Sequence, residues 1–179
     1  MFIVQTYMTL DYESFDLIAD FNEELDGWDY KVGAIKIVID NEEILSLDLW
    51  NNSIDDYWES ILVCMREISE GKNFSQTTLP GTSIYISFAL NKEDNSILIK
   101  REILTKKLRK NVLEDLYNRD IKEGKANYKE FFTKMINEAK NFYQNINRIV
   151  KNPRRNYPEY LDFISRLENR TDLYDKSLK

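Results

Sequence analysis

Residues 127–153 read NYKEFFTKMINEAKNFYQNINRIVKNP, and this stretch decides how the second half of the chain folds. Asn127 occupies an N-cap position with Glu130 three residues on, and Pro153 ends the pattern. Between them, apolar residues recur at the spacing of one helical face: Tyr128, Phe131, Phe132, Met135, Ala139, Phe142, Tyr143 and Ile146. We therefore predict one long amphipathic helix whose apolar face is buried.

Helices are also predicted on both sides of this one. A shorter helix begins at about Pro158, because proline favours a first helical turn and apolar residues follow at helical spacing. Residues 104–120 are predicted to be helical, although Lys106, Lys107, Arg109 and Lys110 leave the buried face undefined. We expect residues 171–179 to form a frayed tail.

The first half of the chain is typical of strands. Phe2–Thr9 is rich in β-branched and aromatic residues. Val32–Ile39 and Ile44–Trp50 are apolar runs separated by four turn-forming residues, which predicts an antiparallel hairpin. A second hairpin is predicted over residues 84–99, where apolar residues alternate on both sides of a polar turn. These runs predict an antiparallel sheet of about five strands.

Residues 53–71, between the two hairpins, predict a helix with clear ends. Ser53 is a suitable N-cap with Asp56 three residues on, and Gly71 is placed to end the helix. The predicted buried stripe consists of Ile54, Tyr57, Trp58, Ile61, Met65 and Ile68. Asp55 and Glu59 are then expected to share an exposed face.

Strands followed by helices indicate an α+β fold, with the helices packed on one face of the antiparallel sheet. At 179 residues the chain has the length of a single domain. We expect a sheet-rich part over residues 1–103, a helical part over residues 104–170 and the frayed tail.

Charge is distributed unevenly along the chain. The first 60 residues hold 15 Asp and Glu against 2 Lys and Arg, whereas residues 91–179 hold 14 against 21. Two interpretations are open: the basic half, including Arg154 and Arg155, pairs with the acidic half inside the molecule, or an acidic face is left for a basic partner.

Composition excludes several classes of function. The chain has no histidine and one cysteine, Cys64, so imidazole-dependent sites and internal disulfides are excluded. The pI of about 4.9 opposes unspecific nucleic-acid binding. No cofactor motif, signal peptide or membrane-length apolar run occurs, so we expect a cytoplasmic protein with no cofactor, no bound metal and no membrane partner.

The candidate partner-binding surface is an acidic stretch with neighbouring aromatic residues. Carboxylates steer a basic partner, and tryptophan and tyrosine anchor interfaces from which water is excluded. The alternative is a solvated surface that only keeps the protein soluble. The stretch begins at Asp16, and the candidate residues are Asp20, Glu23, Glu24, Asp26, Trp28, Asp29 and Tyr30, extended by Asp55, Asp56 and Glu59.

The order of the elements resembles that of small acidic bacterial immunity proteins, which are encoded beside polymorphic or contact-dependent growth-inhibition toxins. The resemblance covers roughly residues 30–148 and is one of pattern. It is carried by Ile44–Trp50, Asp56-Tyr57-Trp58, Leu79-Pro80-Gly81-Thr82 and Tyr128-Lys129-Glu130-Phe131-Phe132. It implies a non-enzymatic protein that neutralises one cognate toxin, frequently a nuclease domain with a basic surface, and transfers no individual site residues.

Two other functions stay open. A small-molecule or regulatory module would bind a ligand in a cleft between the sheet and the long helix, lined by Trp50, Trp58 and tyrosines. A carboxylate-dependent hydrolase would use a pair drawn from Asp55, Glu59 and the acids of residues 20–29, at a catalytic separation.

Overall fold

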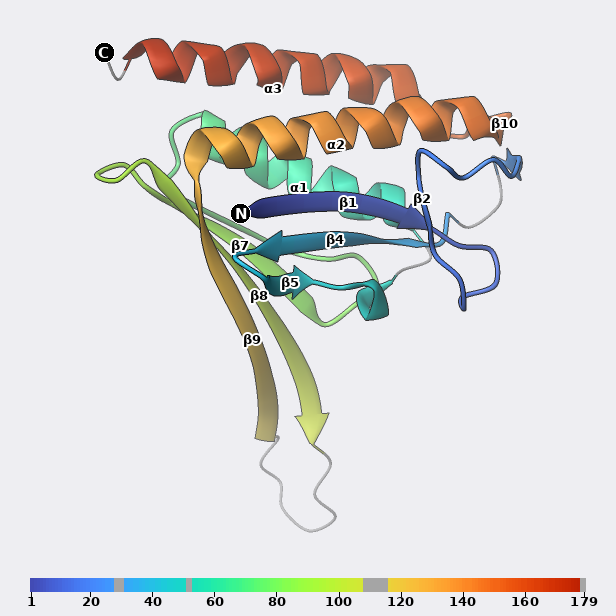
Figure 1. Cartoon of the computed structure of the whole chain (residues 1–179), viewed down its shortest axis with the longest axis horizontal. Coiled ribbons are helices and arrows are strands. Elements are labelled where there is room, and N and C mark those ends of the chain that lie inside the picture. The colour runs from blue at the N-terminus through green and yellow to red at the C-terminus, as the bar shows by residue number, and fades with distance from the viewer. Residues whose placement is uncertain (28–30, 51–52, 108–115, 178–179) are drawn as a thin grey trace.

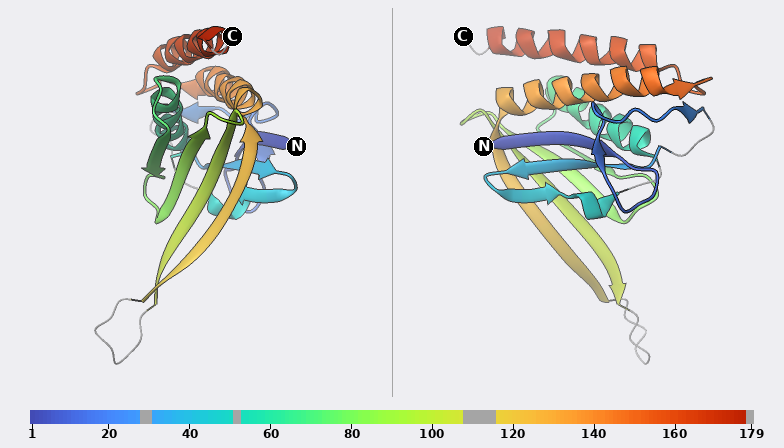
Figure 2. Two further views of the ribbon diagram at one scale, coloured as in Figure 1. Left: turned by 90° about the vertical axis from the view of Figure 1, so that its left-hand side faces the viewer. Right: turned by 45° about the vertical axis from the view of Figure 1, so that its right-hand side comes forward.

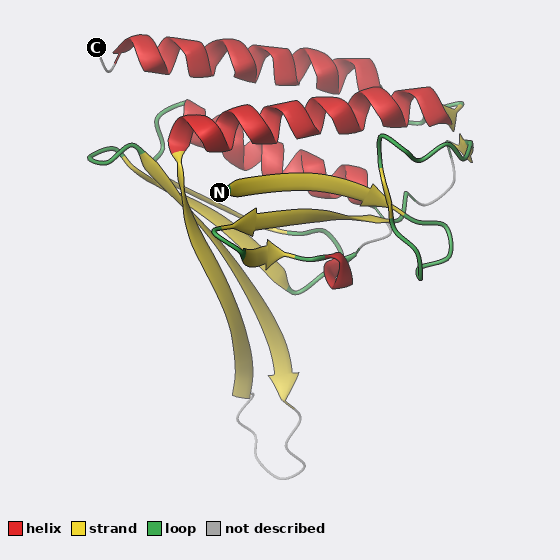
Figure 3. Cartoon of the chain, viewed as in Figure 1, coloured by secondary structure: helices red, strands yellow, loops and turns green. Residues whose placement is uncertain are grey.

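The protein is seen in a computed structural model, which describes residues 1–27, 31–50, 53–107 and 116–177. The described residues form three α-helices: α1 (Ile54–Ser69), α2 (Tyr128–Ile149) and α3 (Tyr157–Ser177). The helices lie together on one side of the strands, with α3 outermost (Figures 1 and 3). The chain is therefore α+β, as its pattern predicts.

The first sheet has four antiparallel strands in the order β2-β1-β4-β5. These are β1 (Phe2–Met8), β2 (Asp16–Leu17), β4 (Gly33–Ile39) and β5 (Glu42–Leu45). The β4–β5 hairpin turns at Asp40 and Asn41, whose φ angles of 49° and 71° are those of a turn that suits strand twist. This sheet holds the acidic N-terminal part of the chain.

The second sheet is formed by β6 (Phe74–Thr78), β7 (Ile84–Asn91), β8 (Ser96–Lys107) and β9 (Leu116–Asn127), in that order. β8 and β9 pair over their whole length of 12 residues and project from the body as a two-stranded ribbon (Figures 1 and 2). β9 runs directly into α2, with Asn127 as both the last strand residue and the helix N-cap.

The two sheets meet where β9 crosses the hairpin of the first sheet. A Cβ added to Gly124 of β9 would lie 2.8 Å from the Cβ of Ile39 in β4. Lys122 in β9 also pairs with Glu42 in β5, at 3.4 Å. Glycine is therefore required at position 124, because the strands approach too closely for a side chain.

The core lies between the strands and the first two helices. Trp58 of α1 is fully buried and stacks on Phe142 of α2 with ring centroids 6.3 Å apart. The Trp58 Nε1–H donates to the Thr6 hydroxyl of β1 at 3.2 Å, so its one polar atom is satisfied. Every apolar position predicted for α1 and for residues 128–146 is buried, which confirms both helical stripes.

The helix ends follow the predicted pattern in part: Ser53 precedes α1 as expected, but its side chain makes no capping hydrogen bond. The Asn127 side chain accepts a hydrogen bond of 3.1 Å from the Glu130 backbone N–H, which caps α2. Gly71 has a φ of 101° just beyond α1, and its N–H donates to the Ile68 carbonyl at 3.0 Å. Within the described residues, no helix has both the length and the apolar composition needed to cross a bilayer.

The predicted strand and helix boundaries are wrong in the middle of the chain. The described strands form two four-stranded sheets and a parallel pair of β3 (Leu25–Asp26) with β10 (Val150–Lys151), not one sheet of about five strands. The run after Leu45 is not a strand, because Leu47–Leu49 forms a 3₁₀ turn, η1.

The helix predicted over residues 104–120 is wrong wherever the structure describes it. Residues 104–107 belong to β8 and residues 116–120 to β9, while residues 108–115 lie outside the described residues. The sheet-rich part therefore extends to Asn127. The tail predicted to fray from residue 171 instead continues α3 to Ser177.

Candidate functional site

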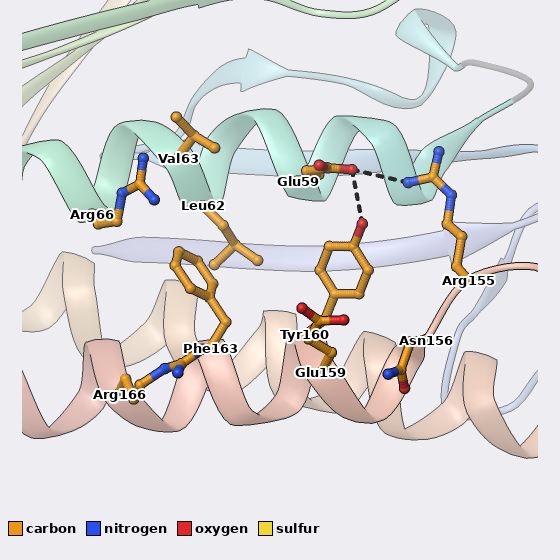
Figure 4. A pocket seen from close by; sticks show the side chains of 10 residues that line it. All are labelled: Glu59, Leu62, Val63, Arg66, Arg155, Asn156, Glu159, Tyr160, Phe163 and Arg166. Atoms are coloured by element: carbon orange, nitrogen blue, oxygen red, sulfur yellow. Dashed lines mark hydrogen bonds and ion pairs between the residues drawn. The ribbon is translucent and has the colours of Figure 1, made fainter.

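The three predicted site acids of α1 converge on one arginine. Arg155, in the connection between β10 and α3, places its Nε 3.3 Å from the Asp55 Oδ2 atom and its Nη1 2.9 Å from the Glu59 Oε2 atom. Its Nη2 also pairs with Asp56. The close-up in Figure 4 shows Arg155 reaching Glu59 from the α3 side. We call these four residues the Arg155 cluster.

Asp55 does not lie on an exposed face, so that prediction is wrong. Its side chain is only 6% exposed, although Glu59 is exposed as expected. Burial raises the pKa of Asp55, and the neighbouring charge of Arg155 opposes the increase. The physical reason for the burial is tertiary: Arg155, distant in sequence, covers the carboxylate and compensates its charge.

Two tyrosines, Tyr160 of α3 and Tyr143 of α2, also attach their helices to α1. The Tyr160 hydroxyl donates to the Glu59 carboxylate at 3.0 Å, and the Tyr143 hydroxyl donates to the Asp55 backbone carbonyl at 3.3 Å. The two tyrosine rings stack with centroids 4.8 Å apart and an interplanar angle of 4°. The Arg155 cluster thus holds the helical layer together, and its three carboxylates all contact the Arg155 guanidinium.

Most of the other predicted acids lie on the surface at one end of the molecule. Asp16, Asp20, Glu23, Glu24 and Asp26 are exposed along the segment from β2 to β3, at the right of Figure 1. Glu13, in the preceding loop, is exposed as well. Trp28, Asp29 and Tyr30 lie outside the described residues. We call the six exposed carboxylates, Glu13 to Asp26, the acidic end.

Only part of the acidic end is compensated inside the molecule. Glu24 pairs with Lys151 of β10. Across the ranges that the structure describes, Glu13, Asp16, Asp20 and Glu23 take part in no ion pair. Four carboxylates on one short segment therefore face solvent with their charge uncompensated.

An exposed aromatic pair adjoins the acidic end. Tyr12, in the loop before β2, is 47% exposed and packs on Trp50, which is 39% exposed, with ring centroids 5.0 Å apart. Leu10 is 56% exposed in the same loop. Sequence reasoning overlooked Tyr12, whose only signal was its place in a polar loop.

The loop that carries Tyr12 is held by local hydrogen bonds. The Asp11 carboxylate accepts from the backbone N–H groups of Glu13 and Ser14, each at 2.9 Å, and these bonds hold the pKa of Asp11 well below its usual range. The Tyr12 N–H donates to the Thr9 hydroxyl at 3.0 Å. Tyr12 is thereby fixed with a φ of 65°.

The predicted aromatic cleft does not form from the named tryptophans. Trp58 is in the core, whereas Trp50 is on the surface against Tyr12, so the two do not line a common cavity. A groove of about 350 Å³ lies instead between α1 and α3 (Figure 4). No group of three or more Cys, Asp or Glu side chains in the described ranges could hold a metal ion.

Comparisons with protein-family models, with curated proteins and with solved structures find no match to this chain.

Proposed function

We propose that this is a non-catalytic protein that binds a basic protein partner through the acidic end and the adjoining Tyr12–Trp50 pair. Following the resemblance to immunity proteins, we propose that the partner is a cognate toxin, a nuclease domain with a basic surface, and that binding neutralises it. One observation carries the proposal: four carboxylates that form no ion pair within the described residues follow Tyr12 along the chain, and the exposed Tyr12 ring packs on the exposed Trp50 ring.

The charge arrangement supports a basic partner. A nuclease presents cations to phosphate, so an acidic protein that covers this surface gains fast association and specificity from complementary charge. Arg155, Lys122 and Lys151 already compensate acids of the first half, namely Asp55, Asp56, Glu59, Glu42 and Glu24. Within the described residues of the acidic end, Glu13, Asp16, Asp20 and Glu23 form no ion pair, which is why the proposal rests on this end and excludes the Arg155 cluster.

The aromatic pair supports the proposal because it can contribute binding energy that charge attraction alone does not provide. Tyrosine and tryptophan are the residue types that carry most binding energy at interfaces, with little rotamer entropy lost on binding. Tyr12 sits in a loop held by the Asp11 and Thr9 hydrogen bonds, so its position is set before a partner arrives. A partner that covered the pair would exclude water from its centre while the carboxylates formed a charged rim.

Growth protection tests the proposed function. The gene beside this one is searched for a candidate toxin domain, which is expressed in cells with or without the protein, and the purified pair is assayed for binding. We expect protection by the unmodified protein and loss of protection by the Asp16→Lys, Asp20→Lys double variant. A matched control, Glu93→Lys with Glu123→Lys, reverses two exposed acids elsewhere and should still protect.

The proposed function is wrong if the unmodified protein neither binds nor protects against the domain encoded beside it. Equal protection by both double variants would refute the acidic end as the interface while leaving the inhibitor function in place.

The hydrolase alternative gains no support from the geometry. Asp55 and Glu59, its main candidate pair, both contact Arg155, and the Asp55 side chain is buried, so the pair does not present two free carboxylates to one cleft. For the small-molecule alternative, the candidate ligand site is the groove between α1 and α3, and not the predicted cleft between the sheet and the long helix.

A further inference from the structure

The groove between α1 and α3 is a second candidate site, separate from the acidic end. Its larger section, of about 350 Å³, adjoins a section of about 290 Å³, and the two share Arg66, Phe163 and Arg166. No residue that lines either section belongs to the acidic end or to the Tyr12–Trp50 pair. Volumes of this size fall near the lower limit of small-molecule sites.

The two ends of the groove differ in charge. At one end, Arg155 and Tyr160 both contact Glu59, and Glu159 adds a second carboxylate to the lining. At the other end lie Arg66, Arg166 and Arg170. Glu70 is the one carboxylate that lines this section, and it pairs with Arg170 at 2.5 Å.

Arg66 and Arg166 are left without an acidic partner. In the part of the chain that the structure describes, neither forms an ion pair. Arg66 belongs to α1 and Arg166 to α3, and Figure 4 shows the Phe163 side chain near both. Two guanidinium groups without an ion pair on one groove are unexpected in a protein of net charge −6, although the Arg66 charge also interacts with the Glu67 carboxylate. Together they form a site whose charge complements an anion.

The floor between these arginines is apolar. It is formed by Leu62 and Val63 of α1 and by Phe163 of α3. Val63 is 39% exposed although it lies in the middle of a helix, and the Arg66 guanidinium carbon lies 5.9 Å from the centroid of the Phe163 ring. An aromatic ring beside a cation and a solvent-facing valine offers a surface for a flat apolar group.

We propose that this groove binds a small organic anion, with its carboxylate, phosphate or sulfonate group between Arg66 and Arg166 and its apolar body on Val63 and Phe163. Guanidinium groups bind such oxyanions through paired, charge-assisted hydrogen bonds. A neutral apolar ligand would leave both cations uncompensated, and a bare inorganic ion would leave the apolar floor in water. An anion with an apolar ring would pair with the two cations and also cover the apolar floor.

A fluorescence titration with 8-anilinonaphthalene-1-sulfonate tests the site, because this probe carries a sulfonate on an aromatic body. Its neutral analogue, N-phenyl-1-naphthylamine, has the same rings without the charge. We expect the Arg66→Ala, Arg166→Ala double variant to bind the anionic probe about tenfold or more weakly, since each charge-assisted hydrogen bond contributes about 1.5–3 kcal/mol. Its affinity for the neutral probe should stay unchanged.

Controls separate the site from general surface charge. The Lys92→Ala, Lys122→Ala variant removes two cations elsewhere and should bind the anionic probe as the unmodified protein does. Val63→Glu, which adds a carboxylate to the floor, should abolish binding of that probe. Circular dichroism melts of every variant establish that each is folded.

Three results would overturn the proposal. The first is equal affinity of the unmodified protein and the Arg66, Arg166 double variant for the anionic probe. The second is equal loss of affinity in the control lacking Lys92 and Lys122. The third is displacement of the probe by inorganic phosphate as effectively as by 1-naphthyl phosphate, which would mean that the apolar floor contributes nothing.

Discussion

The Glu138 carboxylate of α2 accepts a hydrogen bond of 2.7 Å from the backbone N–H of Thr6 in β1. β2 pairs with β1 only at Tyr7 and Met8, so Thr6 has no strand partner for this N–H on that side. The helix therefore supplies the acceptor that the sheet lacks. Burial raises the pKa of Glu138, and the hydrogen bond from Thr6 opposes the increase.

The first prediction concerns the pH dependence that Glu138 creates. Because its pKa in the folded state is raised above the unfolded value of about 4.5, ionisation disfavours folding, and this residue's contribution to stability falls as pH rises through the raised pKa. Glu138→Gln keeps a neutral acceptor for Thr6. We expect the unfolding free energy of the variant, relative to the unmodified protein, to increase from pH 4 to pH 8 in urea titrations.

Glu130→Gln, on the same helix, provides a control of opposite sign. Lys134 lowers the pKa of Glu130, so this carboxylate stabilises the fold above its unfolded pKa and loses that contribution as pH falls. This variant should become less stable, relative to the unmodified protein, as pH rises. A pH-independent difference for Glu138→Gln would contradict the prediction.

The second prediction concerns Arg155. Arg155→Met leaves the buried Asp55 carboxylate without its cation. Breaking a buried pair costs about 3–5 kcal/mol, and because Arg155 is 33% exposed we expect a smaller loss of about 2–3 kcal/mol in urea unfolding at pH 7. Adding Asp55→Asn should restore part of the loss, since no buried charge remains.

A surface pair is the control for this change. Lys125→Met breaks the exposed pair with Asp94 and should cost less than about 1 kcal/mol. If Arg155→Met costs no more than Lys125→Met, the Arg155 cluster does not stabilise the attachment of α3.

The third prediction concerns the aromatic pair. Trp50→Ala should speed dissociation from the proposed basic partner and cost about 2 kcal/mol of binding free energy, because it removes an interface anchor. Protein stability should change by no more than about 0.5 kcal/mol, since Trp50 is outside the core. Surface plasmon resonance and a melting curve measure the two effects.

Phe74→Ala is the matched control, since Phe74 is 54% exposed on β6, in the other sheet. It should leave binding unchanged. An equal effect of the two variants would place the interface elsewhere.

The fourth prediction concerns electrostatic steering. Asp16→Lys with Asp20→Lys should slow association with the basic partner at low salt and reduce its salt dependence, because these carboxylates attract the partner before contact. Association rates at two salt concentrations measure the effect. Glu93→Lys with Glu123→Lys should change the rates much less, and an equal change would mean that only net charge matters.

The fifth prediction concerns Gly124. Gly124→Ala places a Cβ 2.8 Å from the Cβ of Ile39, which is fixed to the backbone of β4 and cannot rotate away. The strands must separate, and we expect a loss of about 1–3 kcal/mol, seen as a lower melting temperature. An unchanged melting temperature would show that the two sheets can shift apart freely.

The helices were predictable because their burial follows the chain's own periodicity. Trp58 and Phe142 occupy positions that helical spacing alone assigns to the core. The β8–β9 ribbon was not predictable, because part of it extends beyond the core: Ile121 is exposed, and so are the charged residues Arg119, Asp120 and Glu123 beside it in β9. The part of a strand that lies outside the core carries no alternation of apolar and polar residues to recognise.

Of the candidate site, the sequence allowed only the acidic charge to be predicted, and not the contacts between its residues. Exposed acids along residues 16–26 agree with the expectation from composition. The burial of Asp55 could not be foreseen, since it depends on Arg155, which lies 100 residues further along the chain. The contact between Tyr12 and Trp50 likewise joins two separate loops, and no local pattern relates them.

The direct passage from β9 into α2 has a mechanical consequence. Hinges are residues in loops or at element ends that absorb large backbone changes, and here the single junction residue, Asn127, is held by the hydrogen bond from Glu130. The projecting ribbon is thus directly continuous with a 22-residue helix. That helix is in turn hydrogen-bonded to β1 through Glu138. A force applied to the arm would be passed to the centre of the protein as torque.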